Sequence, residues 1–229
     1  MNRQIRQLAF VLMALYLVLF AALNYWQVEH TDELASQPGN TRARIREFNR
    51  PRGQIITADG VVVARSVIAP LGESTDVKYT RQYPTGDLFA QIVGYYTFGL
   101  GSTQLERTQN DVLTGDTLTQ QVRALEDLLS TTTDLSGDVV LTLREDMQRT
   151  AKFLLGEREG TIVMIEVATG AITAMWSWPS FDPNLVAQSD YDAAFDYLTE
   201  LQEDPRDPLL ANAYQQRYMP GSTFKVLTT

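Results

Sequence analysis

The chain has 229 residues, of which 44% are hydrophobic and 21% are charged, a composition typical of a folded globular protein. It has no cysteine and one histidine, which excludes a disulfide framework, a thiolate nucleophile and a zinc site built from Cys and His. The net charge of −9 is uneven, because residues 53–229 carry 12 of the 19 basic residues and 24 of the 28 acidic ones. This acidic body argues against nucleic acid as a partner, since phosphate binding needs clustered positive charge.

An uncharged apolar segment lies near the amino terminus. Leu8–Leu23 has no charged residue, and the apolar character continues to Val28. At 1.5 Å per residue, Leu8 to Val28 would span roughly 30 Å, enough for the core of a bilayer. Arg3 and Arg6 precede the segment and three acidic residues follow it, which favours a cytoplasmic amino terminus and an extracytoplasmic main body. We therefore predict a single-pass membrane anchor within residues 1–28.

Two other interpretations of this segment are weaker. A cleaved signal peptide would need a pair of small residues at the cleavage site, and Phe20–Asn24 offers no clean one. A buried helix of a soluble protein would normally show a polar stripe. His30, just beyond the segment, is poorly placed for a Ser-His-Asp triad, so we interpret it as a bystander.

Residues 29–156 are expected to form a linker followed by a small mixed domain. Glu29–Asn40 is polar and contains Pro-Gly, as in a linker, and the arginine-rich stretch Arg42–Arg52 is interpreted as a solvated helix or strand face rather than a headgroup-binding patch. Short β-prone runs follow, with Asp59-Gly60 as a hairpin turn. These runs are Gln54–Ile56, Val61–Ala64 and Val67–Ile68. Further along, the apolar residues of Gln120–Leu129 have the spacing of a helix.

A strand, a helix and a hairpin are predicted after this region. Val139–Leu143 is expected to be a strand, with Thr142 and Glu145 spaced as a capping box for the next helix. Met147, Ala151, Leu154 and Leu155 would form the apolar face of that helix, which Gly156 would end. Thr161–Val167 and Ala171–Ser177 are predicted to pair as a hairpin, the first covered on both faces in a helix-on-sheet layer. Tyr191–Leu201 is a further predicted helix.

Ser222 is the candidate nucleophile. Pro220-Gly221 forms a tight turn before it, and we expect Ser222 to open a helix, with Lys225 one turn later on the same face. A hydroxyl at this place is exposed and close to an amine, which must be neutral to take its proton. The spacing alone is weak evidence, since Thr75 and Lys78 share it and Ser222 could be an ordinary helix N-cap. Gly99-Leu100-Gly101 lacks the third glycine of a dinucleotide loop and is interpreted as a surface turn, so no cofactor or metal site is predicted.

Read together, these segments resemble the class B penicillin-binding proteins, in their penicillin-binding protein A subgroup. Arg52-Gly53-Gln54-Ile55, with Asp59-Gly60 and Val63-Ala64, resembles the signature that opens the family's extracytoplasmic part. The stretches Arg81–Pro84, Gly94–Tyr96, Leu105-Glu106, Asn110-Asp111 and Leu113 resemble the pedestal region. The stretches Val140–Thr142, Gly170–Ile172 and Ser180–Asn184 resemble the start of the transpeptidase domain, and Tyr218–Lys225 resembles the nucleophile motif.

The resemblance implies an α+β chain with three parts: an anchor at 1–28, a linker and pedestal at 29–156, and the truncated start of a transpeptidase domain at 157–229. In the family, a serine at the position of Ser222 attacks the penultimate D-Ala carbonyl of a stem peptide and passes the acyl group to a neighbouring amine, with Lys225 as the expected base. β-Lactams would acylate the same serine. The family's S-x-N and K-T-G motifs are not found in the 229 residues, so we expect this polypeptide by itself to be an inactive fragment.

Two alternatives belong to other classes. A membrane-bound β-lactam sensor also uses S-x-x-K, but such sensors usually carry more membrane spans. A non-catalytic anchor would contact other wall-synthesis proteins through residues 29–156. The resemblance also implies peptidoglycan stem peptides, β-lactams, the membrane and a membrane glycan polymerase as partners.

Overall fold

The computed structural model describes residues 2–25, 42–69, 77–117 and 136–228, in two compact units, Met1–Arg46 and Glu47–Thr229. The first unit contains α1 (Asn2–Asn24), whose side chains are exposed from Arg3 onward. Its stretch Arg3–Asn24 is long and apolar enough to cross a membrane, and a bilayer is the environment that would cover such a surface. The expected linker Glu29–Asn40 lies outside the described residues. The arginine-rich stretch forms a helix, α3 (Arg42–Phe48).

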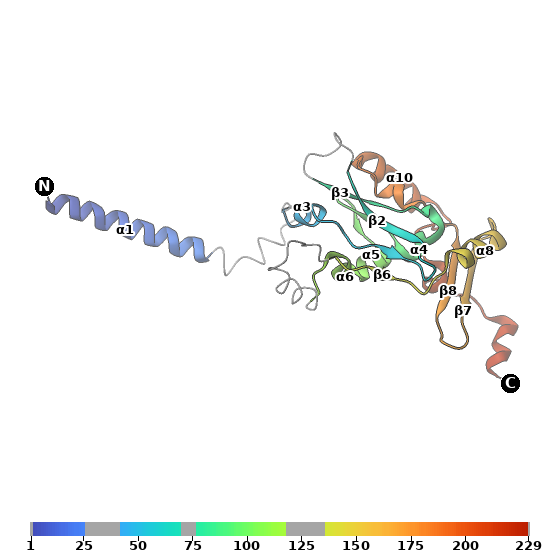
Figure 1. Ribbon diagram of the computed structural model, residues 1–229. Helices are drawn as coiled ribbons and strands as arrows, with labels where there is room; N and C mark the ends of the chain where they lie inside the picture. The colour runs from blue at the N-terminus through green and yellow to red at the C-terminus, as the bar shows by residue number, and fades with distance from the viewer. Residues whose placement is uncertain (1, 26–41, 70–76, 118–135, 229) are drawn as a thin grey trace. The chain divides into compact units, whose positions relative to one another are not determined.

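A four-stranded sheet organises the amino-terminal part of the second unit. Its order is β3-β2-β1-β6, with β6 parallel to β1 and the other neighbours antiparallel (Figure 1). The strands are β1 (Ile55–Ile56), β2 (Val62–Ile68), β3 (Tyr79–Gln82) and β6 (Val139–Val140). The predicted turn joins β1 to β2, where Gly60 has φ +83°. The strand expected over residues 139–143 is shorter, since β6 has only two residues.

Short elements connect β3 to β6. They are η2 (Gly86–Phe89), α4 (Ala90–Val93), β4 (Tyr96–Thr97), β5 (Gly101–Ser102), α5 (Gln104–Thr108) and α6 (Asn110–Thr114). Gly99 and Leu100 lie in the turn between β4 and β5, as predicted, and Gly101 is the first residue of β5, opposite Thr97. The helix predicted over residues 120–129 lies outside the described residues.

The helix α8 (Glu145–Leu155) begins differently from the prediction. The capping box is wrong: the backbone N–H of Glu145 donates to both carboxylate oxygens of Asp59, at 3.1 and 3.0 Å, and the Thr142 hydroxyl donates instead to the Ile172 carbonyl at 2.8 Å. The cap therefore comes from the β1–β2 turn, 86 residues earlier, which ties the two segments together. The helix ends at Gly156, with φ +59°, as predicted.

The buried face of α8 is also different. Ala151 and Gln148 are fully buried, whereas Met147 and Leu154, predicted for the apolar face, are exposed. The Gln148 amide donates to the carbonyls of Leu88 and Met175, at 2.9 and 2.8 Å, and its oxygen accepts from the Met175 N–H at 2.8 Å. A polar residue thus occupies the buried face because it completes backbone hydrogen bonds there.

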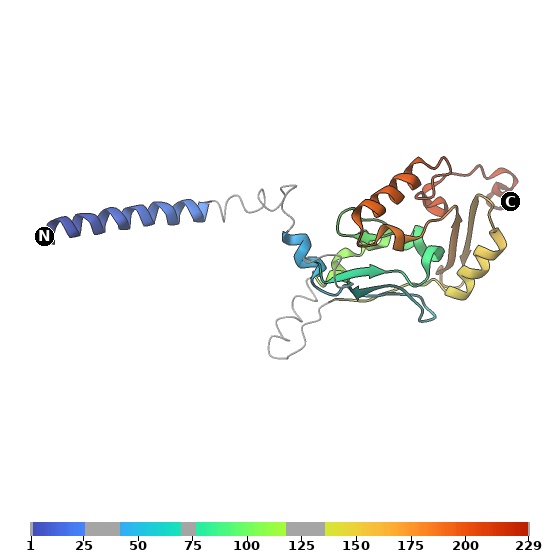
Figure 2. The same ribbon diagram turned by 90° about the horizontal axis from the view of Figure 1, so that it is seen from above.

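The predicted hairpin is present, formed by β7 (Gly160–Ile165) and β8 (Ile172–Trp178), and α8 packs against β8 (Figure 2). The strand β7 is not covered on both faces, because Val163 and Ile165 are partly exposed. The chain continues through α9 (Pro183–Val186), α10 (Tyr191–Glu203), α11 (Asn212–Gln215) and η3 (Gly221–Leu227). One hydrophobic core includes Ile55, Phe89, Ala151 and Trp176, so the sheet, α8 and the hairpin are packed as one body.

Candidate functional site

The segment that leads to Ser222 is attached to the rest of the unit through α11. The Tyr214 hydroxyl lies 2.6 Å from the side-chain oxygen of Gln104 and 3.1 Å from the Gln91 carbonyl. The Asn212 amide donates to the Trp178 carbonyl at the end of β8, at 3.4 Å. These contacts hold the start of α11 on both the hairpin and the helices α4 and α5. Beyond α11 the chain is exposed up to residue 228.

Ser222 and Lys225 lie in η3, a 3-10 helix rather than an α-helix. Gly221 enters it with φ +54°, a conformation that favours glycine, and the Thr223 N–H donates to the Pro220 carbonyl at 3.1 Å. A 3-10 helix has three residues per turn, so side chains three apart lie directly above one another. The serine and the lysine therefore share one face, as expected, although the type of helix differs.

The Ser222 hydroxyl is open to solvent. Within the described ranges no hydrogen bond to its Oγ is found, and the apolar side chains of Met219, Phe224, Val226 and Leu227 around it are also exposed. This arrangement presents a hydroxyl and an amine on one accessible face, the minimum that a serine acyl transfer requires. Among the described residues no group of His, Cys, Asp and Glu is arranged to hold a metal.

A buried ionic cluster lies in the sheet region. It includes Arg52, so the interpretation of Arg42–Arg52 as a solvated face is wrong at this residue, whose charge is buried because it is paired. Both carboxylate oxygens of Glu106 are paired, Oε2 with Arg52 Nε at 2.8 Å and Oε1 with Arg81 Nε at 2.7 Å. Arg52 also donates to the Glu106 carbonyl and to the Asn110 side chain, and Arg81 donates to the Gly53 carbonyl. The three charged side chains are at most 4% exposed. The cluster joins β3, α5 and the chain before β1.

Two tyrosines border the cluster. Burial, reinforced by the charge of Glu106, raises the pKa of Tyr83 well above its usual value, and its hydroxyl lies 3.4 Å from Glu106 Oε1. Burial and the nearby Glu47 carboxylate also raise the pKa of Tyr96, whose ring lies 4.2 Å from the Arg52 guanidinium carbon. Arg52, Arg81 and Glu106 are all in motifs that carried the family resemblance. The sequence motifs identify these three residues. They cannot show that the residues contact one another, because the residues are far apart along the chain.

Comparisons with known proteins identify relatives of this chain. The family model of the penicillin binding protein A dimerisation domain matches residues 52–139, and that of the penicillin binding protein transpeptidase domain matches residues 160–229. A relative from Mycolicibacterium smegmatis, the peptidoglycan D,D-transpeptidase PbpA, is 39% identical over 236 residues, covering 100% of this chain and 47% of the relative. The chain belongs to the penicillin-binding proteins, in their penicillin-binding protein A group.

Other members of the family are similar over shorter stretches. The peptidoglycan D,D-transpeptidase MrdA of Escherichia coli is 29% identical over 177 residues, covering 63% of this chain and 27% of the relative. The penicillin G acyl-enzyme complex of Mycobacterium tuberculosis penicillin-binding protein A superposes with a TM-score of 0.71 and 33% identity, covering 78% of this chain and 41% of that one. The PbpA relatives match this chain over its full length, and the chain spans about half the length of those relatives.

Proposed function

We propose that this chain is part of a membrane-anchored peptidoglycan D,D-transpeptidase, with Ser222 as the nucleophile and Lys225 as the base. The match of residues 160–229 to the transpeptidase family model, with Ser222 and Lys225 on one exposed face, carries the proposal. The relatives are transpeptidases by name, which favours this class over a β-lactam sensor. Substrates would be the stem peptides of peptidoglycan.

The proposed reaction transfers an acyl group in two steps. Ser222 Oγ attacks the penultimate D-Ala carbonyl carbon while the Lys225 amine takes the hydroxyl proton and passes it to the leaving D-Ala nitrogen. The C–N bond breaks and an ester to Ser222 remains. An amine of a neighbouring strand then attacks the ester carbonyl carbon and forms a new C–N bond. The C–O bond to Ser222 breaks, and a proton from the amine returns to Ser222 Oγ through Lys225. A β-lactam would open its ring amide on the same Oγ, in keeping with the acyl-enzyme that the similar Mycobacterium tuberculosis protein forms with penicillin G.

The test uses the protein made from its native gene, in its own membranes, and a fluorescent penicillin. Wild-type protein should become labelled, and Ser222→Ala should abolish the label. Ser102→Ala, the same change at a serine of β5, should leave labelling unchanged. Labelling of Ser222→Ala to the wild-type extent would overturn the proposed nucleophile.

The anchor and its orientation belong to the same proposal. α1 would cross the membrane with Arg3 and Arg6 on the cytoplasmic side, placing the second unit outside, where peptidoglycan and β-lactams are found. A membrane glycan polymerase would supply the strands to be cross-linked. Protease added to intact spheroplasts should digest the second unit; protection of that unit would contradict the orientation.

A further inference from the structure

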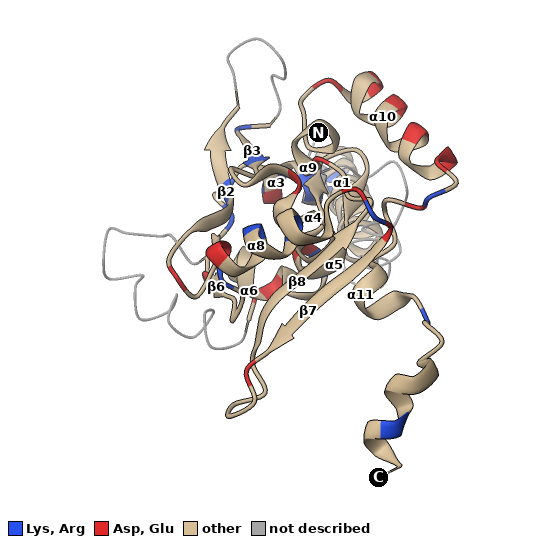
Figure 3. Ribbon diagram, turned by 90° about the vertical axis from the view of Figure 1, so that its right-hand side faces the viewer, with Lys and Arg blue, Asp and Glu red and all other residues tan. Residues whose placement is uncertain are grey.

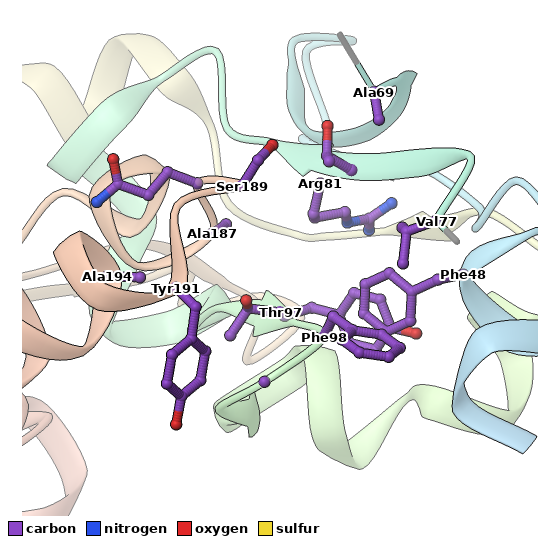
Figure 4. Close-up of a pocket in the computed structure, with 14 residues that line it drawn as sticks. Phe48, Ala69, Val77, Arg81, Thr97, Phe98, Ala187, Ser189, Tyr191 and Ala194 are labelled. Atoms are coloured by element: carbon purple, nitrogen blue, oxygen red, sulfur yellow. The ribbon is translucent and has the colours of Figure 1, made fainter. Parts of the chain in front are cut away.

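A cavity of about 90 Å³ lies between the two regions that the family models match (Figure 4). One wall comes from α3, β3 and β4, with Phe48, Arg81 and Thr97, and the turn after β4 adds Phe98. The other wall comes from the chain between α9 and α10 and from the start of α10, with Tyr191 and Ala194. Most of these side chains are apolar, and the space is suited to a single apolar side chain.

One wall of the cavity has an unsatisfied donor. Arg81 is nine-tenths buried or more, and its Nε and Nη1 donate to Glu106 and to the Gly53 carbonyl. Its Nη2 is buried and has no hydrogen-bond partner among the described residues. Figure 4 shows this guanidinium beside Phe48 and Val77. A buried donor without a partner is uncommon in native proteins, and because this atom exposes less than 1 Å² of surface it is not accessible to an occupant of the cavity.

The rim on the α10 side combines exposed aromatic rings with negative charge. Tyr191 and Phe195 are stacked, with ring centroids 6.2 Å apart and planes 18° apart, and each is about half exposed. Asp192, Asp196 and Glu200 lie at intervals of four residues along the same helix, are exposed, and form an acidic row, with acidic residues coloured red on α10 in Figure 3. Asp192 and Asp196 directly follow Tyr191 and Phe195 in the sequence. In the described part of the chain none of the three carboxylates forms an ion pair.

We propose that this cavity is a docking site for a segment of a partner protein that carries one aromatic or large aliphatic residue followed by lysine or arginine residues. The apolar residue would fill the cavity, and the basic residues would lie over the rings of Tyr191 and Phe195 and beside the acidic row. Lys78 lies next to Val77 in the opposite wall, so the basic part of the partner would face α10. The net negative charge of residues 53–229 would draw such a segment toward this surface.

The cavity residues are distant in sequence from Ser222, and the experiment measures peptide binding rather than acylation. The probes are three fluorescein-labelled peptides in fluorescence anisotropy with the full chain in detergent. The first is Gly-Ser-Trp-Lys-Gly-Lys-Gly-Ser, the second has serine in place of tryptophan, and the third has glutamate in place of both lysines. The first should bind saturably, and the other two should bind at least about tenfold more weakly.

Variants then locate the binding. Tyr191→Ala, and Asp192→Lys combined with Asp196→Lys, should each weaken binding of the first peptide by about tenfold or more. Glu157→Lys combined with Glu159→Lys, the same charge change on the exposed turn between α8 and β7, should alter it by no more than about twofold. All variants should keep the wild-type melting temperature. Absence of saturable binding, equal binding of the peptide without tryptophan, or equal loss in the Glu157 and Glu159 variant would overturn the proposal.

Discussion

Arg52 and Glu106, 54 positions apart in the sequence, form a buried ion pair with 2.8 Å between Nε and Oε2. Arg81 completes the cluster by donating to the other carboxylate oxygen of Glu106. Removing one charged group from a buried ionic cluster lowers the stability of the fold by more than the ion pair itself adds to it. The reason is that the remaining charges stay buried without compensation. The carboxylate of Glu106 is therefore the member whose loss should matter most.

Glu106→Gln should lower the free energy of unfolding by about 3–5 kcal/mol, because it removes the carboxylate between two buried guanidinium groups. Arg52 keeps only a longer contact with Glu47, at 3.6 Å. Urea denaturation followed by circular dichroism measures this change. Glu157→Gln, at an exposed position, should change the unfolding free energy by less than about 0.5 kcal/mol. A loss below about 1 kcal/mol for Glu106→Gln would show that the cluster is not held by its charge.

Gly53 follows Arg52 where the chain passes close to another backbone segment. A Cβ atom at this position would overlap the carbonyl oxygen of Gly137. Gly53→Ala should therefore destabilise the unit by about 1–3 kcal/mol through steric overlap, measured by urea denaturation. Glu157→Ala, at an exposed position, is the control and should change the unfolding free energy by less than about 0.5 kcal/mol. A loss for Gly53→Ala no larger than that of the control would contradict the close approach.

The Asp59 cap of α8 predicts a dependence of stability on pH. The Thr57 hydroxyl, together with the Glu145 N–H, lowers the pKa of Asp59 below its ordinary value of 3.8. A carboxyl group whose pKa is lowered in the folded state stabilises that state above its unfolded pKa, and the stabilisation is lost as the pH falls through the folded pKa. Asp59→Ala should cost about 1 kcal/mol at pH 7, as expected for a lost helix cap.

Thermal unfolding of wild type and Asp59→Ala between neutral and acidic pH checks this prediction. The difference in melting temperature should be largest at neutral pH and should shrink once the pH falls below 3.8, the pKa of an unperturbed aspartate. Glu159→Ala, which removes an exposed carboxylate, should follow wild type throughout. A difference that stays constant over the whole pH range would mean that the charge of Asp59 does not contribute to the cap.

Lys225→Gln tests the proposed base. Without an amine to take the Ser222 proton, the rate constant for labelling of the native-gene protein by fluorescent penicillin should fall by about 10²–10⁴-fold. The time course of labelling in membranes gives this rate. Lys152→Gln is the control. Lys152, in α8, is partly exposed and pairs with Asp87, so this substitution should affect the stability of the fold more than the rate of acylation. Labelling of Lys225→Gln at the wild-type rate would remove Lys225 from the mechanism.

The sequence by itself predicted the features that depend on neighbours along the chain. The apolar segment, the β1–β2 turn at Asp59-Gly60, the β7–β8 hairpin and the helix starting at Tyr191 follow from periodicity and turn chemistry, which act over a few residues. The sequence also predicted that Ser222 and Lys225 lie on one face, because residues three positions apart share a face in an α-helix and in a 3-10 helix alike.

Only the tertiary structure decided which distant residues meet. Glu145 is capped by Asp59 rather than by Thr142, Gln148 rather than Met147 lies on the buried face of α8, and Arg52, Arg81 and Glu106 join in one cluster. Each outcome is set by a neighbour at least 25 positions away that supplies a hydrogen bond or a charge. The energy of such contacts depends on burial and distance, and spacing along the chain carries no information about either.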